Sequence, residues 1–256
     1  MLTLSSDFGS QYPAAMKGVI LQHSDARVTD VTHSLPRQDI RAGAFWCREL
    51  LTQFPPAVHV IVVDPGVGTD RAALVVQAGS HILVGPDNGI LRPVARKLTS
   101  TDEPKQYYRL TVESRASTTF HGRDVFAPAA VTIHERGLDR LVSTPFLTPV
   151  DTASLTSLRL PGYQDNVNEY TGSVIAIDNF GNVITSIPGT AVDAARISVN
   201  GQSVPFVQAF AAVEPGSALV TTGSHGYLEC DVNQGRGECY FDLSTGDMVS
   251  IRTDTE

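Results

Sequence analysis

The sequence has few cysteines and fewer basic than acidic residues. Its cysteines, Cys47, Cys230 and Cys239, are odd in number and form no C-x-x-C pair. We therefore expect no structural disulfide, no zinc site and a reducing compartment. The formal net charge of −8 argues against a partner that is bound through its phosphates, such as a nucleic acid.

The sequence also lacks long apolar runs and the common phosphate-binding motifs. No apolar run has the length that crosses a bilayer, so we expect no membrane association. The first ten residues have no basic stretch followed by an apolar core, so we expect no secretion signal. Neither G-x-x-x-x-G-K-[ST] nor G-x-G-x-x-G occurs. We expect a cytoplasmic protein that uses no cofactor and no metal.

The first half of the chain alternates between short apolar runs and segments with helical spacing of apolar residues. This alternation is typical of an α/β domain with a largely parallel sheet. We expect strands at residues 1–5, 26–31, 58–63, 73–76 and 82–84, and helices at 12–22, 40–54 and 126–134.

From residue 172 onward the apolar runs are short, rich in β-branched residues and separated by glycines and polar residues. Such runs, at 173–178, 182–187, 196–199, 217–221, 227–230 and 247–251, predict a small β-barrel or sandwich. The proline-containing segment 144–170 has no clear period and is interpreted as a linker with at most one short element. We therefore expect two domains, an α/β domain at 1–160 and a smaller β-barrel domain at 161–256.

Three acids follow expected strands in the first domain. Asp7, Asp64 and Asp87 each precede a glycine by two residues, and glycine lets the backbone turn sharply toward a ligand. In open α/β sheets, ligands bind beyond the carboxyl ends of the strands. A single acid at such a place is usually only a turn former, but three in one half-chain make a site as plausible as a set of turns.

Three further motifs carry polar groups that are compatible with a site. In F120-H-G-R-D124 the histidine is a candidate base, metal ligand or helix cap. The motifs I177-D-N-F-G-N182 and T221-T-G-S-H-G-Y-L-E229 could each be no more than a tight turn between strands.

Taken together and in order, these motifs resemble one family over nearly the whole chain. SSDFG, VTDVTHSLPRQDIRAGAF, VHVIVVDPGVGTDR, LVGPDNG, FHGRDVFAPAA, IDNFGNVITSI and GSHGYLE are similar to the S-adenosyl-L-methionine hydroxide adenosyltransferases, which are relatives of fluorinase and chlorinase. The resemblance implies hydrolysis of S-adenosyl-L-methionine to adenosine and L-methionine, by water or hydroxide that attacks the 5′ carbon. It also implies a homotrimer whose substrate lies between one subunit's α/β domain and a neighbour's β-barrel.

The resemblance further assigns roles to individual residues. It places Asp64, Arg71 and His121 in a catalytic triad, with Arg71 returning along the next strand to meet Asp64. It implies that Asp7 holds the ribose hydroxyls and that Thr119 lines the reaction centre. The substrate contacts that it implies in the barrel are Asp178, Asn182, Ser224, Glu229 and the backbone of Val232.

One segment departs from the family pattern. D7-F-G-S-Q-Y12 is two residues shorter than the usual motif and lacks its second acid, so the loop near the ribose or methionine end is expected to differ. The triad residue types, and the absence of a long insertion between residues 89 and 121, favour water over halide as the nucleophile.

A carboxylate, a guanidinium and an imidazole can position and polarise one water molecule. We expect Arg71 to keep Asp64 ionised, which makes Asp64 a weak base and His121 the better proton acceptor. Which of the two takes the proton stays open. Two alternatives also stay open. One is a metal-dependent hydrolase with Asp7, Asp64, Asp87 and His121 as ligands. The other is a non-catalytic protein of the same fold that binds adenosine or S-adenosyl-L-methionine.

Overall fold

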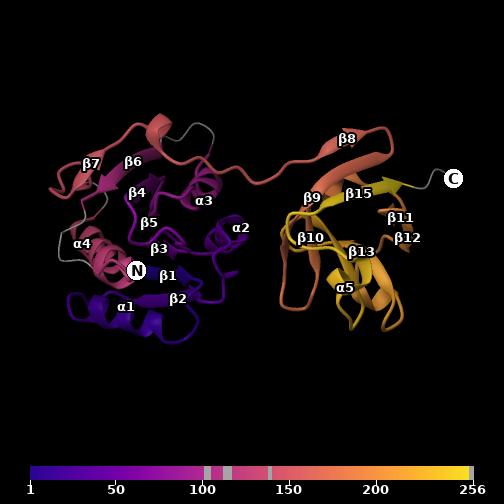
Figure 1. Cartoon of the computed structure of the whole chain (residues 1–256), viewed down its shortest axis with the longest axis horizontal. Coiled ribbons are helices and arrows are strands. Elements are labelled where there is room, and N and C mark those ends of the chain that lie inside the picture. The colour runs from indigo at the N-terminus through magenta and orange to yellow at the C-terminus, as the bar shows by residue number, and fades with distance from the viewer. Residues whose placement is uncertain (101–104, 112–116, 138–139, 254–256) are drawn as a thin grey trace. The chain divides into compact units, whose positions relative to one another are not determined.

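The structure, a computed structural model, describes residues 1–100, 105–111, 117–137 and 140–253. The chain divides into two compact units, Met1–Arg159 and Leu160–Glu256. Figure 1 shows helices and a sheet in the first unit and mainly strands in the second. Within the described ranges, no helix combines the length and the apolar character that a membrane crossing requires.

The first unit is built on a seven-stranded sheet in the order β2-β1-β3-β5-β4-β6-β7. Its strands are β1 (Leu2–Ser6), β2 (Val28–Thr32), β3 (Val58–Val62), β4 (Ala73–Ala78), β5 (His81–Pro86), β6 (Lys105–Leu110) and β7 (Leu147–Pro149). The pairs β1/β2, β1/β3 and β3/β5 are parallel, whereas β4, β6 and β7 extend the sheet in antiparallel fashion. The sheet is therefore mixed, and its parallel part holds the strands that precede Asp7 and Asp64.

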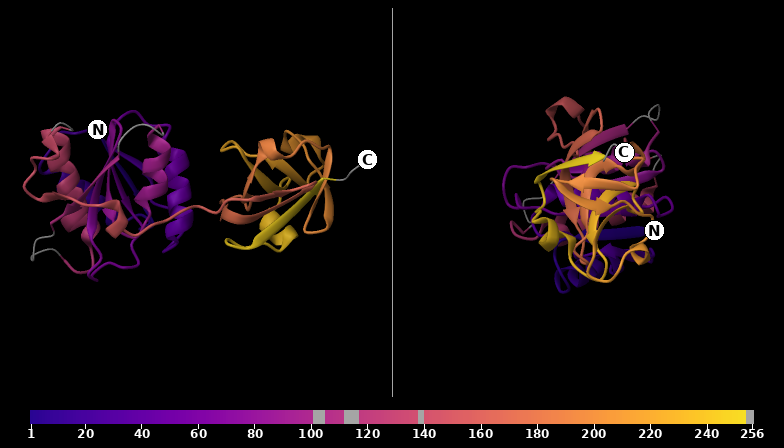
Figure 2. Two further views of the ribbon diagram at one scale, coloured as in Figure 1. Left: turned by 90° about the horizontal axis from the view of Figure 1, so that it is seen from above. Right: turned by 90° about the vertical axis from the view of Figure 1, so that its right-hand side faces the viewer.

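Helices cover both faces of this sheet (Figure 2). They are α1 (Tyr12–Leu21), α2 (Ile40–Leu51), α3 (Leu91–Leu98) and α4 (Ala127–Arg136). Along β3, Val60 and Val62 pack in the core beside α1 and α4, whereas Ile61 packs in the core beside α2 and α3. A strand buried on both faces is expected to be a continuous β-branched run, which is what the sequence shows here.

The helices expected at 12–22, 40–54 and 126–134 are present with slightly different ends. The side chain of Asp39 accepts a hydrogen bond from Ala42 N at 2.9 Å and caps the start of α2. Helix α3 and strand β6 were not anticipated, because α3 is short and contains Pro93, and because the apolar residues of β6 do not alternate regularly. The expectation that 144–170 is a linker with at most one short element is wrong, because the segment contributes β7 to the first sheet and β8 (Gln164–Asn166) to the second.

The second unit is an antiparallel, barrel-like sheet. Its strands are β8 (Gln164–Asn166), β9 (Glu169–Ile177), β10 (Val183–Pro188), β11 (Arg196–Val199), β12 (Gln202–Pro205), β13 (Ala218–Thr222), β14 (Tyr227–Val232) and β15 (Met248–Thr253). They follow the order β12-β11-β15-β9-β10-β14-β13, with β8 paired to β9. A bridge between Phe206, just after β12, and Val220 of β13 brings the two ends together. The predicted fold class, an α/β domain with a smaller β-barrel, is confirmed.

Candidate active site

The loop after β3 carries the motif D64-P-G-V-G68 and ends at β4. Gly68 has a φ of +82°, and a Cβ built there would lie 2.5 Å from the carbonyl oxygen of Thr118. Only glycine therefore allows this loop to lie against the segment that leads to His121. The glycine thus has a specific role, which is to bring two distant segments together.

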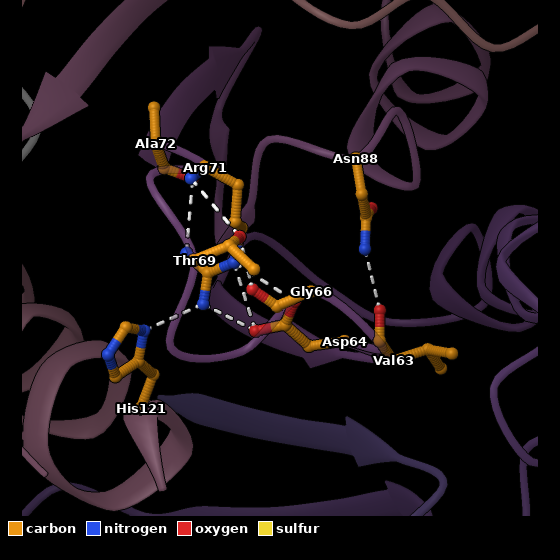
Figure 3. A network of polar contacts seen from close by, with 8 residues as sticks. All are labelled: Val63, Asp64, Gly66, Thr69, Arg71, Ala72, Asn88 and His121. Atoms are coloured by element: carbon orange, nitrogen blue, oxygen red, sulfur yellow. Dashed lines mark hydrogen bonds and ion pairs between the residues drawn. The ribbon is translucent and has the colours of Figure 1, made fainter. Parts of the chain in front are cut away.

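Arg71 binds the carboxylate of Asp64 through two of its nitrogens (Figure 3). Its Nε donates to Asp64 Oδ1 at 2.9 Å, and its Nη2 donates to Oδ2. Both side chains are nearly buried, with 9% and 4% of their surfaces exposed for Arg71 and Asp64. Such a paired contact of a guanidinium with a carboxylate fixes the orientation of both groups.

The expectation that Arg71 lies on the next strand is wrong. Arg71 precedes β4 by two residues, and β5 separates β3 from β4 in the sheet. The two residues meet because the loop between them folds back on itself, with Val67 N bonded to Asp64 O and Thr69 N bonded to Gly66 O, both at 3.2 Å.

His121 completes the cluster from a different part of the chain. Its Nδ1 lies 2.7 Å from Arg71 Nη2. A guanidinium only donates hydrogen bonds, so Nδ1 is the acceptor and carries no proton. Burial lowers the pKa of His121, and the positive charge of Arg71 lowers it further. The ring is therefore neutral at pH 7 and holds its single proton on Nε2.

The turn after His121 and an aromatic ring support this arrangement. Residues Gly122–Phe126 form one π-helical turn that leads into α4, and such turns often occur at functional sites. The ring of Phe126 lies under the guanidinium of Arg71, with 5.3 Å from Cζ to the ring centroid. Arg71 is thus held by a carboxylate, an imidazole and an aromatic face.

Two adjoining cavities open onto this cluster. One has a volume of about 410 Å³ and is lined by Asp64, Thr119 and His121 together with Phe8, Tyr12 and Phe120. The rings of these three aromatic residues contact one another edge to face at centroid distances of 5.3–6.1 Å. Sequence reasoning missed this aromatic wall, although DFG and FHGRD each contain a phenylalanine beside a candidate residue.

The second cavity, of about 440 Å³, contains Asp7. Asp64, Phe8 and Tyr12 line both cavities, so the two are parts of one site. Asp7 Oδ2 accepts a hydrogen bond from Gln38 N at 2.8 Å. The structure therefore brings together Asp7, Asp64, Thr119 and His121, with Arg71 bound behind them.

Asp87 does not join this group. Its Oδ1 accepts a hydrogen bond from Thr156 N at 3.0 Å and so ties down the segment after β7. Its neighbour Asn88, which sequence reasoning missed, donates from Nδ2 to the carbonyl of Val63 at 2.7 Å and fixes the strand end before Asp64 (Figure 3). Across the described ranges, no three His, Cys, Asp or Glu side chains are placed to hold a metal ion. Asp7, Asp64, Asp87 and His121 therefore do not form one such group.

The second unit has a cavity of its own, of about 740 Å³. All five residues expected to contact substrate from the barrel line it: Asp178, Asn182, Ser224, Glu229 and Val232. Phe180, which is largely exposed, and Phe210 add aromatic rings to the same cavity. The motifs around Asp178 and Glu229, each of which could have been only a turn, thus line the same cavity.

The turn interpretation of Asp178 nevertheless holds as well. Its Oδ1 accepts from Phe180 N and Asn182 N at 2.9 Å, and its Oδ2 accepts from Asn182 Nδ2 at 3.0 Å. Both oxygens therefore already stabilise the turn between β9 and β10. This occupancy leaves less capacity for a ligand at Asp178 than the sequence suggested.

Glu229 is held by a histidine of the neighbouring turn. His225 Nε2 lies 2.8 Å from Glu229 Oε1, and both side chains are nearly buried. A Cβ at Gly223 would lie 2.4 Å from the same Oε1, so a larger residue at 223 would displace the carboxylate. The turn between β13 and β14 is thus shaped around the Glu229 side chain.

Asp231, two residues further along β14, was not anticipated. It is fully buried, and neither carboxylate oxygen has a hydrogen-bond partner within the part of the chain that the structure describes. Burial raises its pKa to about 8, and the negative charges of Glu229 and Asp178 contribute. The alternation along Y227-L-E-C-D-V232 places Glu229 and Asp231 on one face, which is the signal that could have revealed it.

Comparison with known proteins agrees with this architecture. An (R)-S-adenosyl-L-methionine hydrolase of Salinispora arenicola is 36% identical over 98% of this chain and 97% of its own. A fluorinase of Actinopolyspora mzabensis is 24% identical over 98% of this chain and 96% of its own. A crystal structure of an uncharacterized conserved protein from Thermotoga maritima covers 98% of this chain and 100% of its own, with a TM-score of 0.84 and 29% identity.

Two family models match the chain in succession. The N-terminal domain model of the SAM hydroxide adenosyltransferases matches residues 2–141, which include the cluster of Asp64, Arg71 and His121. The C-terminal domain model of the same family matches residues 172–250, which include the cavity of the barrel. The chain therefore belongs to the SAM hydroxide adenosyltransferase family.

Proposed function

We propose that this protein hydrolyses S-adenosyl-L-methionine to adenosine and L-methionine. The observation that carries the proposal is the cluster in which Arg71 binds both Asp64 and His121 beside a cavity. The name of the Salinispora arenicola relative, (R)-S-adenosyl-L-methionine hydrolase, supports the same substrate and the R configuration at sulfur.

The reaction is an in-line displacement. A water oxygen bonds to the 5′ carbon, the bond from that carbon to sulfur breaks, and its electron pair stays on sulfur as the neutral thioether of methionine. The positive charge on sulfur disappears as the bond breaks, so an aromatic surrounding of low polarity favours the reaction. Phe8, Tyr12 and Phe120 supply that surrounding. Alignment of the water contributes about 7–11 kcal/mol where its geometry is near attack.

The hydrogen bonds support Asp64, and not His121, as the acceptor of the proton. In the neutral ring, Nδ1 is occupied by Arg71 and Nε2 already carries a proton. His121 therefore has no free lone pair, and its role is to hold Arg71. The proton of the attacking water passes to the carboxylate of Asp64 and from there to solvent.

The remaining residues bind the substrate. Asp7 accepts hydrogen bonds from the two ribose hydroxyls, and Thr119 lies beside the reacting carbon. In the barrel, Glu229 binds the methionine ammonium, because the oxygens of Asp178 are already used by its own turn. Ser224 binds the methionine carboxylate, while Asn182 and the backbone of Val232 bind the adenine.

We further propose a homotrimer in which each substrate lies between the first unit of one subunit and the second unit of a neighbour. The separation of the candidate residues into one cavity per unit supports this arrangement. Coexpression of Asp64→Asn chains with Glu229→Ala chains tests it. An intersubunit site combines an intact first unit from one variant with an intact second unit from the other, so activity returns. Failure to regain activity, or a monomer by light scattering, contradicts the assembly.

The function itself is tested by chromatography of the purified protein with each sulfur epimer of S-adenosyl-L-methionine, with and without EDTA. The proposal predicts adenosine and methionine in equal amounts from the R epimer, and no effect of EDTA. Tight binding without product would favour a non-catalytic binding protein. Activity that EDTA abolishes would favour a metal-dependent hydrolase.

A further inference from the structure

A serine, a histidine and an aspartate form a chain of contacts next to Asp7, outside the triad. Ser6 Oγ lies 2.8 Å from His33 Nδ1, and His33 Nε2 lies 3.0 Å from Asp30 Oδ1. Lys17 pairs with the other oxygen of Asp30 at 2.8 Å. Ser6 is only 1% exposed, so it is not accessible as a nucleophile and the contacts must serve another purpose.

His33 holds the turn that carries Asp7 from both sides. On one side its ring binds the hydroxyl of Ser6, and that hydroxyl accepts a hydrogen bond from Phe8 N at 3.4 Å. On the other side its backbone carbonyl accepts a hydrogen bond from Gly9 N at 2.9 Å. The residues on either side of Asp7 are thus tied to a single residue of another segment.

The roles of the two ring nitrogens follow from their neighbours. Asp30 Oδ1 lies 3.0 Å from Nε2 without the geometry of a hydrogen bond, and its negative charge favours a proton on Nε2. Nδ1 is then left to accept from the hydroxyl of Ser6. In metal sites, the residues that hydrogen-bond to a ligand side chain orient it in a similar way. Here the oriented element is the turn from Ser6 to Gly9.

We propose that His33, together with Ser6 and Asp30, is a positioning residue for the Asp7 carboxylate and thereby for recognition of the ribose diol. The inference rests on the proposed function, because it requires Asp7 to bind ribose. His33 touches no substrate and acts only through the turn. Its loss weakens binding of the ribose and leaves the triad geometry, and hence kcat, within about threefold of wild type.

Three substitutions at one position separate positioning from general stability. Asparagine places its amide oxygen near the position of Nδ1, so His33→Asn can still accept from Ser6. Glutamine places its amide nitrogen near the position of Nε2, so His33→Gln retains only the contact with Asp30. We expect His33→Ala, His33→Gln and Ser6→Ala each to lose roughly tenfold in affinity for adenosine, and His33→Asn to stay within about threefold.

The discriminating readout is the ratio of affinities for adenosine and 2′-deoxyadenosine, measured by calorimetry beside KM and kcat. In wild type the ratio exceeds one, and in His33→Ala and Ser6→Ala it falls toward one. The double variant should lose no more than either single variant, since the residues act as a unit. His23→Ala, at an exposed histidine, is the matched control and should leave the ratio unchanged.

The outcomes separate the positioning role of His33 from the proposed function of the protein. An active wild type whose ratio persists in His33→Ala and Ser6→Ala overturns the positioning role alone. If the ratio of affinities falls equally in His33→Asn and His33→Ala, the positioning role is also overturned. A wild type that forms no adenosine overturns the proposed function and the inference with it.

Discussion

Replacement of the buried acid Asp231 by asparagine should stabilise the second unit in a way that depends strongly on pH. The substitution keeps the shape of the side chain, removes the charge and replaces one oxygen by an amide nitrogen. Asp231 is fully buried, its oxygens have no partner within the described ranges, and its pKa is raised from 3.8 to about 8 by burial first and then by Glu229 and Asp178. The ionised form of this side chain is therefore costly.

The sign and size of the effect follow from proton linkage. Between pH 3.8 and about 8, the folded chain keeps a proton on Asp231 that the unfolded chain has released. The contribution of Asp231 to stability is therefore fully present below pH 3.8 and is lost as the pH rises through this window. Each pH unit costs about 1.4 kcal/mol, so at pH 7 the wild type is less stable than the asparagine variant by roughly 4 kcal/mol.

Calorimetric unfolding at pH 4 and pH 8 measures this difference. The single tryptophan, Trp46, lies in the first unit, so its fluorescence is not a suitable probe of the barrel. The variant and the wild type should unfold at similar temperatures at pH 4, and the variant should unfold at a distinctly higher temperature at pH 8. Asp165→Asn, at an exposed acid of the same unit, is the control. Parallel pH profiles for Asp231→Asn and wild type would refute the reasoning.

Three further predictions concern other residues. Asp7→Ala should weaken adenosine binding by about 1.5–3 kcal/mol, since hydrogen bonds to a charged group are lost, and equal calorimetric affinities of variant and wild type would speak against the ribose assignment. Because the pKa of His121 is lowered by burial and by Arg71, activity should decline only as the pH falls below 6.5. His121→Ala should lose about 10²-fold in kcat, because Arg71 and Asp64 are then no longer held in place. His121→Asn, which can still accept from Arg71, should retain more, and equal losses would contradict the holding role. His59 is fully buried beside Thr3 and His81, and burial lowers its pKa to about 3. The stability of the fold should therefore fall as the pH drops from 6.5 toward 3. A His59→Gln variant with the same acid sensitivity in calorimetry would contradict this.

Much of the fold could be predicted because its strands and most of its helices have strong local patterns. The run V58-H-V-I-V-V63 is buried on both faces, and α2 has a capping aspartate and regular apolar spacing. Strand β6 lacked such a pattern. Helix α3 has apolar residues at helical spacing, but it is only eight residues long and contains Pro93, so its pattern was overlooked. The antiparallel side of the sheet depends on the β4–β5 pairing, which apolar periodicity does not reveal.

The residues of the candidate site were predicted one by one from motifs, but the hydrogen bonds between them were not. Motifs placed Asp64 and His121 among the important residues, whereas the hydrogen bond from Arg71 to Nδ1 of His121, which decides the tautomer, required coordinates. The same holds for Asp87, which had the same local pattern as Asp64 but accepts a hydrogen bond from Thr156 N instead of joining the site. Asp231 stayed unnoticed although the alternation along β14 places it on the same face as Glu229. Alternation alone does not show that its oxygens are buried without a partner among the described residues.

The central claim is that water held by the Asp64–Arg71–His121 cluster attacks the 5′ carbon. Turnover of S-adenosyl-L-methionine in ¹⁸O-labelled water, followed by mass spectrometry of both products, tests it most directly. The account predicts one labelled oxygen at the 5′ position of adenosine, none in methionine, and no 5′-halogenated nucleoside as the main product in high chloride or fluoride. Unlabelled adenosine, an unsaturated nucleoside or a 5′-halo nucleoside as the main product would contradict it.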